Sequence, residues 1–171
     1  MKELIIFGRS PFINKLNLEN IDYNRFDVCC INYPIKNIKV HYVVSADDWV
    51  MPKLAPKTEW ISQNTGYNLV KTDEIVQDGK KLSWRLYSSS LAVNFGISKG
   101  YKRIYLGGID LIEDDKPFSH YDGVINQKPA SANSMVKEKA YIKKLAQVYN
   151  VELFQLNKNA GWLEFKDIGL L

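Results

Sequence analysis

Residues 84–111 place the tightest constraint on the fold, because their pattern predicts a loop, a helix, a sharp stop and then a strand. The serines at 88–90 precede a periodic apolar run, which is where the residue that caps a helix start is typically found. Gly100 suits the left-handed conformation that commonly ends a helix. Residues 103–106 then predict a buried strand that breaks at Gly107 and Gly108.

Two places in this segment suit a ligand. A serine-rich helix start offers backbone amides and hydroxyls to a phosphate. The turn formed by Gly108, Ile109 and Asp110 has little side-chain bulk and ends on a carboxylate, at the end of a strand where open α/β sheets bind ligands. The alternative is purely structural, with the serines as a helix cap and the glycines as a turn.

Earlier in the chain, four further strands are expected, and each ends on polar residues. Residues 4–7 predict a buried strand that ends at Gly8, Arg9 and Ser10. Residues 27–32 predict a second strand ending on Asn32, residues 40–44 a third, and residues 60–61 a fourth. The resulting edge of hydrogen-bonding groups suits recognition of a base or a sugar, although neither the G-x-G-x-x-G fingerprint nor a P-loop is present.

The remaining segments complete an alternation of strands and helices. A surface excursion or a hairpin is expected over 71–82, a loop over 113–134, a last strand over 151–156 and a short terminal segment over 162–171. Helical periodicity over 136–149 places Val136, Ala140, Ile142, Leu145, Ala146 and Tyr149 on the apolar side. This order predicts one α/β domain over residues 1–171, with a three-layer, mostly parallel, doubly wound sheet of Rossmann type.

Charge and cysteine content indicate which ligands and which cellular compartment are expected. The net charge is only +4, and the lysines are scattered instead of clustered with aromatic residues, so nucleic-acid binding is not expected and an anionic small ligand fits equally well. Cys29 and Cys30 are adjacent in a predicted strand and should point to opposite faces as buried free thiols, which suits a reducing cytoplasm. No signal peptide and no run of about 20 apolar residues is present, so a cytoplasmic protein without a transmembrane segment is expected.

The sequence resembles the bacterial CMP-sialic-acid sialyltransferases of glycosyltransferase family 42. The central match is Arg85-x-x-Ser88, a helix, and then the run from Gly100 to Asp110, of which only the run from Gly100 to Asp110 is specific. Supporting matches are the strand-Gly start at 4–11, the strand that ends on Asn32, and the segment 119–123 around His120. Motility-associated and phage-encoded relatives share the same core.

The resemblance implies a GT-A-like sialyltransferase core that uses a CMP-sugar without a metal or another cofactor. It implies a nucleotide site at Gly8, Arg9, Ser10, Asn32, Arg85, Ser88, Ser89, Gly108, Ile109 and Asp110. His120 would be the general base that deprotonates an acceptor hydroxyl, since the pKa of a histidine lies near the working pH. Tyr121 would contact the phosphate, and a glycan or another hydroxyl compound would be the acceptor.

The sequence departs from the family pattern at three points. Arg9 stands where the family has an asparagine, and Ile112 stands where a lid tyrosine is expected. Only ten positions separate Asp110 from His120, so the lid over 111–134 is short. These departures leave enzyme activity open, and the alternative is a non-catalytic nucleotide- or sugar-binding or interaction protein. A homo-oligomer would allow a neighbouring copy to supply the lid.

Other polar residues have both a functional and a structural interpretation. His41 is expected to be a histidine within a strand. Asp47 and Asp48 would be a metal or acid–base pair only if their carboxylates converged, and adjacent side chains usually point in different directions. No Cys/His group has zinc-ligand spacing, and no metal site is expected.

Overall fold

A computed structural model describes residues 2–45, 68–70, 76–77, 80–81, 87–112, 118–119, 121, 123, 125–126 and 131–171. Its centre is a seven-stranded sheet in the order β11-β10-β7-β1-β2-β3-β4, in which every neighbouring pair is parallel. The strands are β1 (Glu3–Phe7), β2 (Phe26–Ile31), β3 (Tyr42–Val44), β4 (Asn68–Val70), β7 (Arg103–Gly107), β10 (Glu152–Gln155) and β11 (Glu164–Phe165). The expected α/β fold with a parallel sheet is confirmed.

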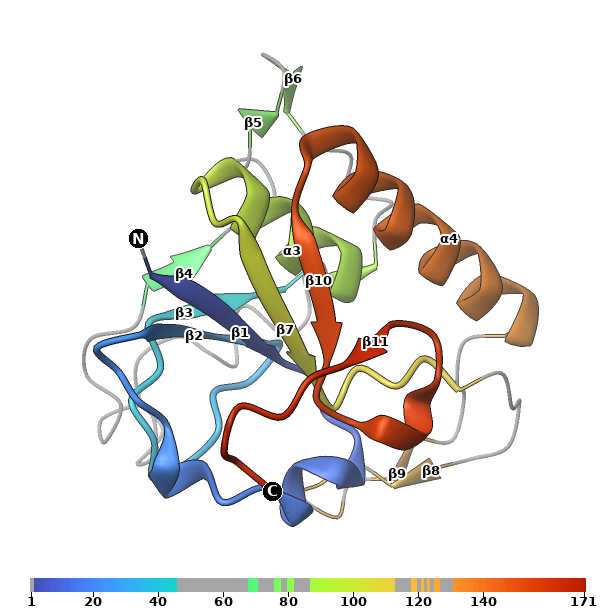
Figure 1. The fold of residues 1–171 in the computed structure, drawn as a ribbon. Coiled ribbons are helices and arrows are strands. Elements are labelled where there is room, and N and C mark those ends of the chain that lie inside the picture. Colours follow the sequence, from blue (N-terminus) through green and yellow to red (C-terminus); the bar gives the residue numbers. More distant parts are fainter. Residues whose placement is uncertain are drawn as a thin grey trace.

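β1 lies at the middle of the sheet, between β2 and β7. The register pairs Phe7 with Cys30 on one side and with Gly107 on the other. Three parallel strands therefore end at the same edge, and the loops that follow them meet there (Figure 1). We call this the carboxyl edge of the sheet.

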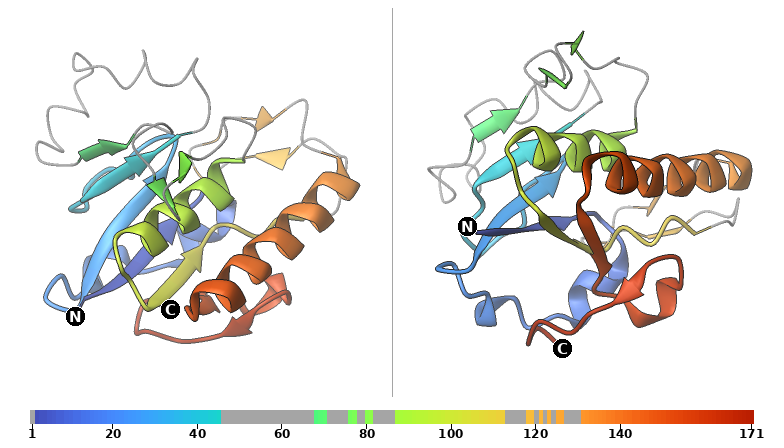
Figure 2. Two further views of the ribbon diagram at one scale, coloured as in Figure 1. Left: turned by 90° about the horizontal axis from the view of Figure 1, so that it is seen from above. Right: turned by 45° about the horizontal axis from the view of Figure 1, so that its top comes forward.

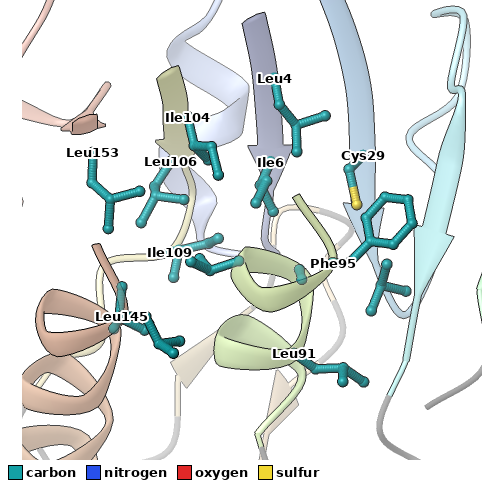
Figure 3. Packing of buried hydrophobic residues seen from close by; sticks show 14 of the residues in the cluster. Leu4, Ile6, Cys29, Leu91, Phe95, Ile104, Leu106, Ile109, Leu145 and Leu153 are labelled. Carbon is teal, nitrogen blue, oxygen red and sulfur yellow. The ribbon is translucent and has the colours of Figure 1, made fainter. Parts of the chain in front are cut away.

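The helices α3 (Ser88–Ser98) and α4 (Ala132–Tyr149) cover one face of the sheet (Figure 2). α3 approaches closely, because a Cβ on Gly96 would lie 2.8 Å from methyl carbons of Ile104 and Leu4. Figure 3 shows side chains from α3, α4 and the strands pointing into one apolar cluster, among them Leu4, Ile6, Leu91, Phe95, Ile104, Leu106, Leu145 and Leu153. None of the helices in the described ranges is long and apolar enough to cross a bilayer.

The opposite face is covered by 3-10 turns and by the end of the chain. The turns η1 (Pro11–Lys15) and η2 (Leu18–Asn20) follow β1, and the Asn17 amide donates to the Leu170 carbonyl over 2.7 Å. Their apolar side chains pack on the second face of the sheet, where Ile5, Phe7, Val28, Tyr105 and Phe154 are buried. Because both faces are covered, β1, β2 and β7 are apolar along most of their lengths instead of alternating.

Most expected elements are confirmed, with several differences in detail. β5 (Val76–Gln77) and β6 (Lys80–Lys81) pair antiparallel, as the expected hairpin requires. The segment predicted as a loop over 113–134 holds the short strands β8 (Phe118–Ser119) and β9 (Ile125–Asn126), and its last residues are helical because α4 already begins at Ala132. β4 and β11 were not expected, and the strand predicted at 60–61 lies outside the described residues.

The apolar face of α4 differs from the predicted one. Val136 is 48% exposed and Ala140 is exposed, whereas Glu138, Ile142 and Leu145 are buried. The buried positions are spaced four and three residues apart, as one face of a helix requires. The predicted apolar face was wrong at Val136 and Ala140, because the prediction did not allow the acidic Glu138 to be buried.

Cys29 and Cys30 are buried free thiols, as predicted. They lie in different clusters, on opposite faces of the sheet. Burial raises the pKa of Cys30 to about 12 and raises the pKa of Cys29 well above its ordinary value. Both side chains are therefore apolar core residues in the thiol form.

Candidate functional site

The turns after β1 and β7 are in direct contact. The Gly8 amide donates to the Gly107 carbonyl over 2.8 Å, and the Ser10 amide donates to the Gly108 carbonyl over 3.0 Å. A Cβ on Gly8 would lie 2.8 Å from Cγ1 of Ile109 and still closer to the Gly108 carbonyl oxygen. Glycine at position 8 therefore permits the two turns to touch, and this contact sets the shape of the carboxyl edge.

Asp110 joins three loops at this edge. Its Oδ2 accepts a short hydrogen bond from the Ser10 hydroxyl, and its Oδ1 accepts a bond of 3.0 Å from the Asn157 side-chain amide. The Ser10 hydroxyl also accepts from the Phe12 amide over 3.2 Å and so caps η1. Asp110 thus links the turn after β1, the turn after β7 and the loop after β10.

Asn32 and Ser88 form the second part of the site. Asn32 follows β2 with a left-handed φ of 66°, and its amide donates to the Val44 carbonyl over 2.9 Å. The Ser88 hydroxyl, at the first residue of α3, donates to Asn32 Oδ1 over 3.2 Å. This pair connects the end of β2 to the start of α3, at the edge where Gly8 and Ser10 lie.

The serine-rich helix start differs from the expected cap. The N-cap residue is Tyr87, which makes no side-chain capping bond, and the serines occupy the first turn. The acceptor comes from α4 instead, because Glu138 Oε1 accepts from the Ser89 hydroxyl over 2.5 Å and from the Ser90 amide over 2.8 Å. A carboxylate from 48 residues away therefore satisfies the amide that a local cap would satisfy.

Arg9 stands at the carboxyl edge next to an aromatic ring. Its guanidinium carbon lies 5.0 Å from the centroid of the Tyr33 ring, a cation–π distance. The Arg9 carbonyl accepts from the Tyr121 amide over 2.9 Å, and the Tyr121 carbonyl accepts from the Asn14 side chain over 3.1 Å. The backbone of Tyr121 is therefore anchored beside the end of β1. Ile112, which stands where the family has a lid tyrosine, is 61% exposed.

The structure brings most of the predicted site residues to one edge. These are Gly8, Arg9, Ser10, Asn32, Ser88, Ser89, Gly108, Ile109, Asp110 and Tyr121. Arg85, His120, Asp47 and Asp48 lie outside the described residues. Among the residues that the structure does describe, none of the His, Cys, Asp and Glu side chains form a group of three that could hold a metal ion.

His41 lies at the opposite end of the sheet. Its Nδ1 accepts from the Val28 amide over 2.9 Å, and its Nε2 lies 3.4 Å from Asp27 Oδ1. Burial lowers the pKa of His41, and this effect exceeds the opposing effect of Asp27. His41 is accordingly a partly buried neutral residue that helps to hold β3 against β2.

Sequence reasoning missed Glu138, Asn157 and Gln155. Gln155 is fully buried, and its side-chain amide donates to the Ile109 carbonyl over 3.0 Å, which supports the turn that carries Asp110. Two signals were available in the sequence. Polar residues follow the last strand just as they follow the earlier ones, and an acidic residue occupies the apolar period of the second helix.

No protein-family model and no curated protein matches the sequence. A solved structure of the sialyltransferase CstII from Campylobacter jejuni, in complex with the substrate analogue CMP-3FNeuAc, aligns with a TM-score of 0.57 at 16% identity. That alignment covers 98% of this chain and 87% of CstII. The chain has the fold of a sialyltransferase.

Two further CstII structures agree. A variant in complex with CMP aligns with a TM-score of 0.59 at 14% identity, over 97% of this chain and 87% of the other. CstII in complex with a trisaccharide acceptor and CMP aligns with a TM-score of 0.52 at 14% identity. That alignment covers 97% of this chain and 86% of CstII. At 14–16% identity, the chain and CstII share a fold, and a shared fold alone does not establish a shared function.

Proposed function

We propose that the carboxyl edge of β1, β2 and β7 binds the nucleotide of a CMP-activated sugar, and that the protein is a sialyltransferase-like glycosyltransferase. The observation that carries this proposal is the convergence of Asn32 and Ser88 with the Gly8 and Gly108 turns. An amide and a hydroxyl of fixed geometry suit the hydrogen-bonding groups of a base or a ribose. The complexes of CstII with CMP and with CMP-3FNeuAc, which share the fold, support the choice of nucleotide.

Arg9 is the proposed phosphate-binding residue. It follows β1 directly, and the Tyr33 ring beside it limits the directions that the guanidinium takes. Guanidinium groups bind phosphate through two parallel hydrogen bonds. In the family a lid tyrosine contacts the phosphate, and this chain has Ile112 at that position. We propose that the guanidinium of Arg9 makes the phosphate contact instead.

The chemical step that we propose needs one base. His120 takes the proton of an acceptor hydroxyl, the acceptor oxygen bonds to the anomeric carbon, and the bond from that carbon to the phosphate oxygen of CMP breaks. CMP leaves as an anion that Arg9 stabilises. The role of His120 comes from the family resemblance, and the anchoring of the next residue, Tyr121, beside Arg9 supports it.

Calorimetric titration with CMP tests the nucleotide site. Asn32→Gly removes the side-chain amide but keeps a residue that tolerates the left-handed φ of 66°, so weaker CMP binding is expected in a folded protein. Asn37→Gly is the matched control, because Asn37 has a φ of 62° and is exposed in the β2–β3 connection. Equal CMP affinity in the wild type and Asn32→Gly would contradict the proposed site.

A donor-hydrolysis and transfer assay tests the chemistry separately. His120→Ala is expected to abolish turnover while CMP still binds, and His41→Asn is expected to leave turnover unchanged. Unchanged turnover in His120→Ala would exclude the base role. CMP binding without turnover by the wild type would favour a nucleotide-binding protein without catalysis, as the exposed Ile112 in place of a lid tyrosine suggests.

A further inference from the structure

Glu138 is a buried acid that neither the sequence motifs nor the proposed chemistry explains. It belongs to α4, is 4% exposed and lies in the helix face that packs toward α3. Its Oε1 accepts from the Ser89 hydroxyl over 2.5 Å and from the Ser90 amide over 2.8 Å. Burying a carboxylate is costly unless hydrogen bonds compensate, so a buried acid in this place implies a specific task.

The bonds of Glu138 fix the first turn of α3. The start of a helix has amides without partners inside the helix and carries a partial positive charge, so a carboxylate there is held by both effects. Tyr87, the N-cap residue, supplies no side-chain acceptor to this turn. Glu138 therefore does from α4 what a local capping residue does in other helices.

Ser88 is the residue next to those that Glu138 holds. Its hydroxyl donates to Asn32 Oδ1 over 3.2 Å, so the orientation of the first turn of α3 decides whether this bond forms. The path from Glu138 to Asn32 runs through Ser89 and Ser88, which are consecutive in one helical turn. A displacement of that turn moves one wall of the proposed nucleoside site.

We infer that Glu138 is a positioning residue, which holds the first turn of α3 so that Ser88 and Asn32 present a fixed surface to the nucleoside part of the ligand. The inference rests on the proposed function and adds the residue that determines the geometry of its α3 side. In this inference Ser88 and Asn32 bind the nucleoside part of the ligand, and Arg9 binds its phosphate. Loss of the Glu138 side chain should therefore weaken the binding of cytidine and the binding of CMP by the same factor.

The test measures the affinity of folded variants for cytidine and for CMP. Glu138→Ala removes both bonds, and about tenfold weaker binding of both ligands is expected. Glu138→Gln keeps an acceptor oxygen for the Ser89 hydroxyl and the Ser90 amide, so it should restore binding to within about threefold of the wild type. Ile142→Val is the matched control, because it removes one methyl group from the buried face of the same helix one turn later and leaves both hydrogen bonds of Glu138 in place.

A second variant covers the case in which Glu138→Ala does not fold. Ser89→Ala removes one of the two contacts, and about threefold weaker binding of both ligands is expected. Equal affinities for Glu138→Ala and the wild type would overturn the inference, and so would a loss in Ile142→Val as large as that in Glu138→Ala. If Glu138→Ala does not fold, equal affinities for Ser89→Ala and the wild type would overturn it. Wild-type protein that binds neither ligand would overturn the proposed function and this inference together.

Discussion

The side-chain amide of Asn157 donates to Asp110 Oδ1 over 3.0 Å and ties the loop after β10 to the turn after β7. The other oxygen of the same carboxylate accepts from the Ser10 hydroxyl. Both oxygens of Asp110 thus have protein partners, and these partners come from the loops after β1 and β10. Asp110 therefore connects the three loops at the carboxyl edge, in addition to the contact between the turns at Gly8.

The first prediction concerns Asp110→Asn. An asparagine keeps one acceptor and turns the other oxygen into a donor that faces the Ser10 hydroxyl or the Asn157 amide. The unfolding free energy should fall by about 1–3 kcal/mol, because two hydrogen bonds to a charged acceptor are replaced by weaker or mismatched ones. Urea denaturation measures this loss.

Asp167→Asn is the control for that experiment. Asp167 Oδ1 accepts a single bond of 2.8 Å from the Gly169 amide, and an asparagine oxygen can accept the same bond. A change within about 0.5 kcal/mol is expected. Equal losses in the two variants would show that Asp110 has no special structural role.

The second prediction concerns the phosphate and Arg9. Arg9→Gln should weaken CMP binding about tenfold, since a charged hydrogen bond to phosphate is lost, while the affinity for cytidine stays unchanged. The difference should shrink at high ionic strength because salt screens charges. Calorimetric titrations of both ligands at two salt concentrations provide the measurement.

Arg103→Gln serves as the matched cation control. Arg103 pairs with Glu152 over 2.6 Å at the amino end of the sheet, away from the carboxyl edge. Its loss should leave both affinities unchanged. A parallel decrease for CMP and cytidine in Arg9→Gln would assign Arg9 a structural role instead of phosphate binding.

Local patterns in the sequence predicted the parts of the fold that depend on neighbouring residues. Apolar runs identified β1, β2 and β7, and Gly100 marked the end of α3 with a φ of 86°. Because parallel strands end at one edge, the polar residues that follow them could be grouped into a site on sequence grounds. Asn32 and Ser88 are in contact, as this grouping requires.

Contacts between distant residues could not be predicted in this way. The acceptor for the start of α3 is Glu138, and nothing near Ser89 in the sequence indicates that a second helix supplies it. β4 spans three residues, too few for a periodic signal. The bond from Asn157 to Asp110 likewise depends on β10 lying beside β7, which only the sheet order establishes.

The third prediction concerns pH and His41. Burial lowers the pKa of His41 in the folded protein below its ordinary value of 6.5, with Lys39 and Lys2 acting in the same direction and Asp27 against them. The unfolded chain therefore binds more protons in this range, and the unfolding free energy should fall as the pH decreases below about 6.5. Urea titrations between pH 7 and pH 5 measure the slope.

His41→Asn separates this effect from those of the acids. Asparagine can still accept from the Val28 amide but does not titrate, so the slope between pH 7 and pH 5 should flatten. Glu3 and Asp27 contribute at lower pH. Burial acts to raise the pKa of each carboxyl, but hydrogen bonds hold both below their ordinary values of 4.5 and 3.8. Their contribution to stability is lost only as the pH falls through those lowered values. An unchanged slope in His41→Asn would contradict the assignment.

The fourth prediction concerns Cys29 and Cys30. Both are fully buried, and burial raises the pKa of each thiol, so the reactive thiolate is absent at neutral pH. A thiol reagent should modify the native protein only at the rate of its opening, and should modify both residues at once in denaturant. Rapid labelling of the native protein would contradict the packing of β2.

The central claim is that a nucleotide binds at the carboxyl edge, and an amide chemical-shift titration with CMP locates the binding site directly. We predict shifts at Gly8, Ser10, Asn32, Ser88 and Gly108, with UMP, AMP and GMP producing smaller changes at equal concentration. Shifts confined to the amino end, around Glu3, Arg25 and Arg103, or no shifts at all, would contradict the account.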